Sequence, residues 1–334
     1  LKPFWLELPK TIALASTVAV WLLVSIPSRA HIAAMIGRNA LLNQARSEMA
    51  RGLSTGAGSG NALKVSLSGT GTSFMSWMLG FCSELQLSGR FGEGSTAHGV
   101  SGGATCAAFL AAGIDMSLES EAMGALEAEN ERCRRGERTL GEIIPAFLDR
   151  AIREEDVARL DGRTYVYLRD ASGPLLRAMR STSPIVVSKF ADKADVIDAL
   201  VAATHIPYVV NGARAARCRG QDCIDYGPMP QNFFVVDGTT VNVNVFPHPS
   251  WAGPMPAESA LSRTVVALYG RLTNGAGAPV HVHPWLVPSF SIFKVMGLDD
   301  LRLRPVSGRS LRERHRLGQE AFHSWSAQRD AQEC

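Results

Sequence analysis

The chain is predicted to fold as an α/β protein, with a sheet covered by helices on both faces and an N-terminal hydrophobic helix in front. Short apolar runs alternate with longer helix-prone stretches over residues 61–330, which is the pattern of layered α/β domains. Two of these apolar runs end in turns rich in serine and glycine, at residues 68–71 and 99–103. A Gly-x-Ser-x-Gly turn between a strand and a helix is typical of serine hydrolases.

The alternation predicts the elements in order. A strand over residues 62–68 is followed by a helix over 74–87, and a strand over 94–100 by an alanine-rich helix over 104–112. The remaining expected elements are a helical region over 118–159, strands over 165–169 and 185–188, a helix over 191–204, strands over 233–236 and 264–269, and a closing helix over 310–328.

Residues 98–103 read His-Gly-Val-Ser-Gly-Gly and point to a nucleophile. Gly99 and Gly103 permit a tight turn in which a side chain would collide with the backbone. The helix over 104–112 would begin just beyond Ser101, so its free N–H groups and positive dipole end would favour negative charge there. The pattern therefore predicts Ser101 as an exposed nucleophile.

Two further strings would complete a catalytic set. The first strand ends in Ser-Gly-Thr-Gly, which predicts an oxyanion loop at Gly69, Thr70 and Gly71. The run Phe-Phe-Val-Val is followed by Asp237 and the turn residue Gly238. An aspartate in an ordinary Asp-Gly turn is the alternative, but together with the serine turn it makes Asp237 a candidate base.

These motifs resemble the patatin-like phospholipases, most closely the branch that contains adipose triglyceride lipase and adiponutrin. The resemblance covers residues 61–330. Four motifs carry it, in the order found in the family: the strand and glycine loop at 65–71, the serine turn at 99–103, the strand, helix and Ile-Pro turn at 187–208, and the Asp-Gly pair at 237–238. It implies a three-layer patatin-like sheet with helices on both faces.

The resemblance also implies a Ser-Asp dyad without cofactor or metal. Asp237 would take the proton from Ser101, Gly69, Thr70 and Gly71 would stabilise the oxyanion, and water would release the acyl group. The expected activity is that of a lipid ester hydrolase, a triacylglycerol lipase or phospholipase A type, acting at a membrane or lipid-droplet surface. Two alternatives remain open: a non-hydrolytic lipid-binding or regulatory protein, and an acylglycerol transacylase.

Two positions depart from the family pattern. Phe74 stands where the family commonly has glycine, and Thr239 replaces the second glycine after the aspartate. We expect Phe74 either to narrow the acyl entrance or to displace the amides of the glycine loop, and we favour the first, since both glycines of the loop are retained.

Five of the eight histidines are candidates for a competing triad with Ser101, and each is expected to be packed or solvated instead. The pair His281 and His283 would share one strand face, but no third ligand is near in sequence, so no metal site is expected. The five are His98, His205, His248, His281 and His283.

The N-terminal part predicts a membrane anchor. Residues 11–28 carry no charge and come near the ~20 apolar residues that span a bilayer. A cleaved signal peptide is the rival, since residues 28–30 loosely fit a cleavage site. The expected organisation is an N-terminal flank (1–10), the anchor (11–28), a linker (29–60) with a glycine- and serine-rich end, and the catalytic domain (61–330).

Composition excludes other classes. A formal net charge of +3 suggests no nucleic-acid partner. The six cysteines form no C-x-x-C pair or zinc spacing. Cys218 and Cys223 are expected in a loop, where they would pair in an oxidising compartment and stay reduced in the cytosol.

Overall fold

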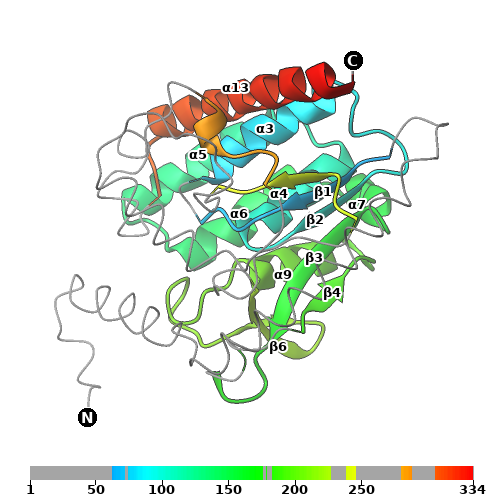
Figure 1. Ribbon diagram of the computed structural model, residues 1–334. Coiled ribbons are helices and arrows are strands. Elements are labelled where there is room, and N and C mark those ends of the chain that lie inside the picture. The colour runs from blue at the N-terminus through cyan, green and yellow to red at the C-terminus, as the bar shows by residue number, and fades with distance from the viewer. Residues whose placement is uncertain are drawn as a thin grey trace, which may run out of the picture. The chain divides into compact units, whose positions relative to one another are not determined.

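A mixed seven-stranded sheet carries the fold, which confirms the α/β class (Figure 1). The computed structural model describes residues 62–71, 74–175, 178, 183–226, 238–245, 280–287 and 305–333. All of these residues belong to one compact unit of the chain. The predicted hydrophobic helix at 11–28 and the linker lie outside the described residues.

The strands run in the order β5-β6-β3-β2-β1-β7, with β4 also paired to β3. The parallel part consists of β7, β1, β2 and β3, and the three other strands pair antiparallel. The strand bounds are β1 Lys64–Leu67, β2 Thr96–Gly99, β3 Thr164–Asp170, β4 Ile185–Val187, β5 Ala216–Cys218, β6 Gln221–Asp225 and β7 Val241–Val243.

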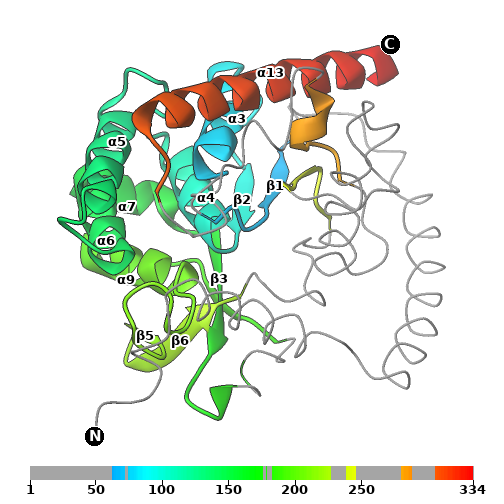
Figure 2. The same ribbon diagram turned by 90° about the vertical axis from the view of Figure 1, so that its left-hand side faces the viewer.

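The described helices pack mainly around one face of this sheet. Their bounds are α3 Met75–Leu87, α4 Gly102–Ala112, α5 Glu121–Arg134, α6 Leu140–Ala151, α7 Glu154–Leu160, α9 Lys193–Ala203, the 3-10 helix η2 Pro284–Leu286 and α13 Gly308–Glu333. Helix α4 packs on β1, β2 and β3, while α9 packs on β3, β5, β6 and also on α4. These two helices therefore lie on the same face (Figure 2). A helical layer on the opposite face is not found among the described residues.

The two faces of the parallel strands differ in chemistry because side chains alternate along a strand. Val65, Leu67 and Ala97 belong to the main hydrophobic core. The intervening positions are polar and still buried, among them Ser66 and His98. The strands are therefore buried on both faces, as parallel strands usually are, but only one face is apolar.

Most of the predicted elements are confirmed to within a few residues: β1, α3, β2, α4, β3, β4, α9 and α13. The helical region expected over 118–159 is three helices. Gly136, with a φ of 75°, follows the end of α5, and Ile152 is extended after α6. A left-handed glycine is a common helix terminator.

The expected loop at 218–223 is wrong, because these residues form a hairpin of β5 and β6. Its two turn residues, Arg219 and Gly220, have φ values of 50° and 76°, as a two-residue hairpin turn requires. Strand β7 was not predicted. The strands expected at 233–236 and 264–269 lie outside the described residues.

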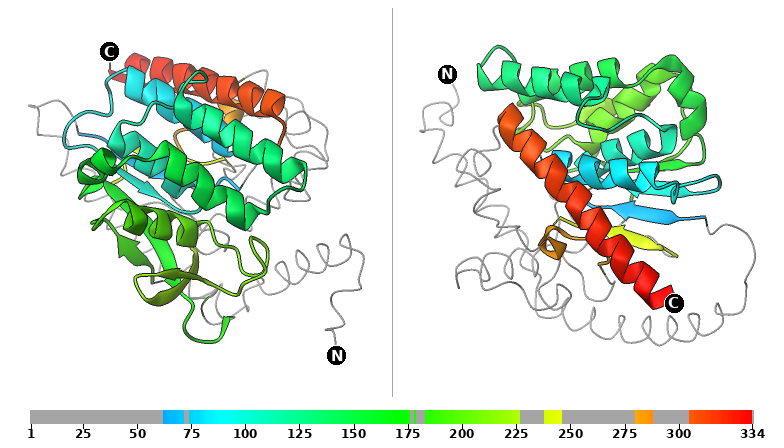
Figure 3. Two further views of the ribbon diagram at one scale, coloured as in Figure 1. Left: turned by 180° about the vertical axis from the view of Figure 1, so that it is seen from behind. Right: turned by 90° about the horizontal axis from the view of Figure 1, so that it is seen from above.

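No helix in the described part of the chain is both long and apolar enough to span a membrane. The longest, α13, runs along α3 (Figures 1 and 3). The two helices approach closely at a pair of glycines. A Cβ on Gly80 would overlap the backbone of His315, and one on Gly318 would overlap the carbonyl of Trp77 and lie 2.9 Å from the nitrogen of Phe81.

This crossing predicts that Gly318→Ala lowers the free energy of unfolding by about 1–3 kcal/mol, because the added methyl forces α13 away from α3. The matched control is Gly124→Ala inside α5, where a Cβ meets nothing within 4 Å and better helix propensity should stabilise by about 1 kcal/mol. Urea-induced unfolding of the full chain measures both. Equal stability of the two variants would contradict the close crossing.

Candidate active site

The turn between β2 and α4 has a strained backbone at Ser101. Its φ is 53° and its ψ is −137°, a conformation that costs a residue with a Cβ about 1–3 kcal/mol. Only two other non-glycine residues in the described part of the chain have a positive φ, namely Tyr208 and Arg219. A serine on a sharp, strained strand-to-helix turn is the defining feature of a nucleophile elbow.

The glycines beside Ser101 are required by close contacts with backbone atoms. A Cβ on Gly99 would lie 2.5 Å from the Cα of Ala104, in the first turn of α4. A Cβ on Gly103 would lie 2.6 Å from the carbonyl oxygen of Leu67 and would overlap that of Ser68. The predicted clash at both glycines is therefore confirmed, and α4 sits directly against the ends of β1 and β2.

Helix α4 presents its N-terminus to Ser101, which is its N-cap residue. All eleven residues of the helix are buried, so solvent screens its dipole little. The N–H of Gly102 follows the nucleophile directly, and in such elbows this group contributes to the oxyanion hole. Sequence reasoning missed Gly102, although the motif itself contained the signal.

The glycine loop after β1 lies beside Ser101 as predicted. A Cβ on Gly69 would lie 3.2 Å from the Cβ and 3.7 Å from the Oγ of Ser101. A Cβ on Gly102 would overlap Oγ1 of Thr70. The backbone N–H groups of Gly69, Thr70 and Gly71 donate to no acceptor among the described residues. The loop therefore supplies unused donors next to the serine hydroxyl.

The predicted base, Asp237, lies outside the described residues, so its role stays a prediction. Its neighbour Gly238 is described, and a Cβ there would lie 3.9 Å from Nζ of Lys64. The N–H of Thr240 also donates to the carbonyl of Lys64 at 2.9 Å. Gly238 therefore lies at the amino end of β1, whereas Ser101 lies beyond the carboxyl end of β2. A four-residue strand separates these edges by about 10 Å.

Ser101 Oγ makes no hydrogen bond to any described residue, so no described histidine is placed to accept its proton. His98 stacks on Tyr165 at 4.3 Å, and its Nδ1 lies 3.0 Å from the hydroxyl of Tyr167. Burial, and then the charge of Lys64, lower the pKa of His98 to about 4, so the ring is neutral at pH 7.

Three of the other candidate histidines are also packed. His205 Nε2 lies 3.2 Å from the carbonyl of Ala213, and His281 Nδ1 accepts the N–H of Asn242 at 2.9 Å. Burial lowers the pKa of His283 to about 4. His248 lies outside the described residues. No group of three metal-ligating side chains occurs in the part of the chain that the structure describes.

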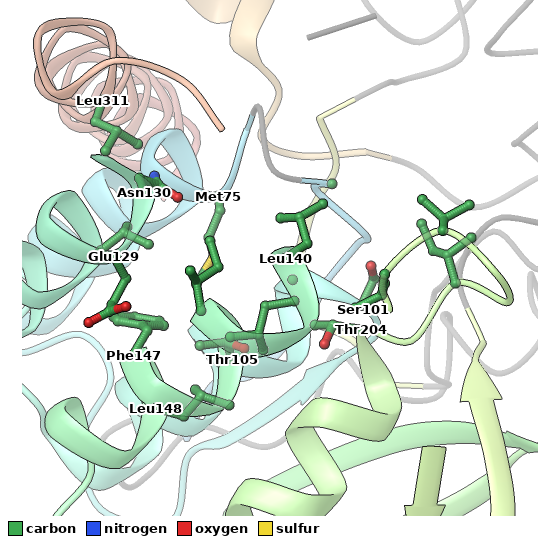
Figure 4. Close-up of a pocket in the computed structure, with 18 residues that line it drawn as sticks. Met75, Ser101, Thr105, Glu129, Asn130, Leu140, Phe147, Leu148, Thr204 and Leu311 are labelled. Atoms are coloured by element: carbon green, nitrogen blue, oxygen red, sulfur yellow. The ribbon is translucent and has the colours of Figure 1, made fainter. Parts of the chain in front are cut away.

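An elongated, mainly apolar pocket opens beside Ser101, with about 890 Å³ of empty space that includes some open solvent. Figure 4 places Ser101 and Thr204 at one end and Glu129 and Asn130 at the other. Helices α3, α4, α5, α6 and α13 all contribute side chains. The apolar lining includes Met75, Leu126, Leu140, Ile143, Ile144, Phe147, Leu148 and Leu311.

Phe74 does not narrow this pocket, contrary to the favoured expectation. Its side chain is fully buried in the core, and the pocket is lined by its neighbour Met75 instead. The N–H of Phe74 donates to the carbonyl of Thr70 at 3.2 Å. The backbone of Phe74 thus connects the glycine loop to the start of α3, and its side chain packs in the core.

Cys218 and Cys223 are buried free thiols on neighbouring strands. A hydrogen bond joins the two side chains, and it lowers the pKa of Cys218 and raises that of Cys223. The pair is therefore close in space, and the reduced form is compatible with the fold.

No protein-family model matches the chain, and a search of curated proteins found no match. The resemblance to patatin-like phospholipases therefore depends on the four motifs, two of which surround Ser101 in the described structure.

The strain at Ser101 predicts that Ser101→Gly is more stable than Ser101→Ala by about 1 kcal/mol. Both variants lose the hydroxyl, but alanine keeps a Cβ at φ 53°. Glycine removes a strain of about 1–3 kcal/mol, and the greater entropy of its unfolded chain offsets about 0.5–1 kcal/mol of that gain. Thermal unfolding of the two variants measures the difference. An alanine variant at least as stable as the glycine variant would rule out a strained turn.

Proposed function

We propose that this protein is a serine acyl hydrolase that cleaves fatty-acyl esters of acylglycerols or phospholipids. The observation that carries the proposal is the strained turn at Ser101 between β2 and α4. Natural proteins retain such strain where a side chain must be held in a reactive position. The resemblance to patatin-like phospholipases points to the same residue.

The groups around Ser101 suit attack on an ester carbonyl. The N–H groups of Gly69, Thr70 and Gly71 donate to no described acceptor, and that of Gly102 stands at the start of α4. Aimed at the developing oxyanion, one such donor is worth about 10²–10³ in kcat. Water entering after the alcohol leaves would then hydrolyse the acyl-enzyme.

The pocket suits the acyl chain. Its lining is mostly aliphatic, and it extends away from Ser101 between α4, α5 and α6. Apolar linings with a few polar groups are typical of ligand-binding clefts. An extended hydrocarbon chain gains about 0.8 kcal/mol per buried methylene group. The chain would bind in the pocket with its carbonyl next to the serine.

Asp237 is the base in this proposal, a role that the resemblance implies. It would accept the hydroxyl proton of Ser101 and return it to the leaving alcohol. Gly238 lies at the amino end of β1, and consecutive Cα atoms are only about 3.8 Å apart. The dyad therefore requires the turn at Gly238 to move toward the carboxyl edge of the sheet when substrate binds. The lipid substrate would be met at a membrane or lipid-droplet surface, with residues 11–28 as the anchor.

The same geometry favours a second candidate, a lipid-binding protein that does not hydrolyse. The apolar pocket is present, but Ser101 Oγ has no hydrogen-bond partner among the described residues, and Gly238 lies far from it. An acceptor alcohol in place of water would make the protein a transacylase, and this alternative shares the nucleophile and the pocket with hydrolysis.

A fluorophosphonate probe should label the wild-type chain at Ser101, because it reports an activated serine beside oxyanion donors. Ser101→Ala should lose the label. The matched control is Ser83→Ala, a buried serine of α3 whose hydroxyl has no hydrogen-bond partner among the described residues, and it should label like wild type. An unlabelled but folded wild-type chain would favour the lipid-binding candidate.

Asp237→Asn should reduce the turnover of a short-chain ester by about 10²–10⁴, the range expected when a general base is lost, while leaving thermal unfolding unchanged. His205→Asn is the control, since His205 is packed against the carbonyl of Ala213 and has no catalytic role in this proposal. Steady-state kinetics of both variants measure the effect. A histidine variant as inactive as Asp237→Asn would exclude the dyad.

A further inference from the structure

The end of the pocket remote from Ser101 is polar, although the rest of the lining is apolar. Glu129 and Asn130 are consecutive residues of α5, and both line the pocket (Figure 4). Glu129 is 1% exposed and Asn130 is 7% exposed. An unsubstituted hydrocarbon chain forms no hydrogen bond with either side chain, so the presence of both in the lining requires an explanation.

The carboxylate of Glu129 is already paired with three arginines. Its Oε1 lies 3.0 Å from Arg132 and 3.7 Å from Arg150, and its Oε2 lies 3.2 Å from Arg138. These ion pairs join α5 to α6 and to the connection between them. The buried carboxylate therefore has a structural role that does not depend on a ligand.

Asn130 differs because its amide forms no hydrogen bond with any described residue. The amide atoms are not fully enclosed by protein, so they are open to a ligand in the pocket that Asn130 lines. An unpartnered polar side chain that is nine-tenths buried and lines a pocket therefore points to a polar group on the ligand. The amide offers both a donor and an acceptor, which matches a hydroxyl.

We propose, resting on the acyl hydrolase function above, that the preferred acyl chain carries a hydroxyl substituent and that Asn130 binds it. The hydroxyl accepts from the amide nitrogen of Asn130 or donates to its amide oxygen. A site built to hydrogen-bond a hydroxyl discriminates strongly against the analogue that lacks it, since its polar groups are then left buried and unpaired.

Binding tests this assignment separately from catalysis. The full chain with Ser101→Ala is titrated with stearate and with hydroxystearates that carry the hydroxyl at different carbons, each displacing a fluorescent fatty acid. At least one hydroxystearate should bind about tenfold or more tightly than stearate. Asn130→Leu in the same background should remove this preference. If that variant does not fold, Asn130→Ala is used, since the readout is a ratio within each variant.

The control is Thr105→Val, which removes a different hydroxyl from the lining of the same pocket and should keep the preference. Equal affinities for stearate and every hydroxystearate, or a preference that survives the loss of Asn130, would overturn the proposal. Failure to displace the probe with any fatty acid would also overturn it. A preference for hydroxystearate in a chain that the fluorophosphonate does not label supports the pocket assignment and rejects hydrolysis, so the two proposals can fail independently.

Discussion

The close approach of α4 to the carboxyl ends of β1 and β2 is the constraint on which the site depends. Gly99 and Gly103 permit it, because a Cβ on either would enter the backbone of the neighbouring element. Because α4 lies this close, only two residues connect the end of β2 to the start of α4. The backbone must turn sharply within this connection, and Ser101 takes a positive φ. Ser101 is only 8% exposed, so the prediction of an exposed nucleophile is wrong; the tight packing beneath the serine leaves it open only to the pocket.

The pocket follows from the same packing. Helix α4 is buried along its whole length, and on the side away from the sheet it is covered mainly by α3 and α7. The buried carboxylate of Glu129 holds α5 to α6 through Arg150 of α6 and Arg138 of the connection between the two helices. The apolar side chains of α6 then enclose a space that begins at the serine, because the first turn of α4 lines both the site and the pocket.

The sequence predicted the part of the site that local backbone geometry determines. The serine turn, the glycine loop and the helix after Ser101 depend on residues close together in the chain, where glycine spacing and an alanine-rich run are strong signals. Strand β7 has only three residues and forms through pairing with β1, which no local pattern indicates. Asn130 could not be predicted for a similar reason. A single asparagine in a charged helix is usually solvent-exposed, and only tertiary packing buries this one.

Backbone strain and unpaired polar groups both lower stability, so their location in a fold is informative. Of the three non-glycine residues with positive φ in the described structure, Arg219 is explained by its two-residue hairpin turn. Ser101 lines the pocket, and Tyr208, 61% exposed, lies between the lining residues Ile206 and Val209. The unpartnered amide of Asn130 faces the same space. The strained serine and the amide of Asn130 thus line one pocket, which is expected if this pocket is where the protein meets its ligand.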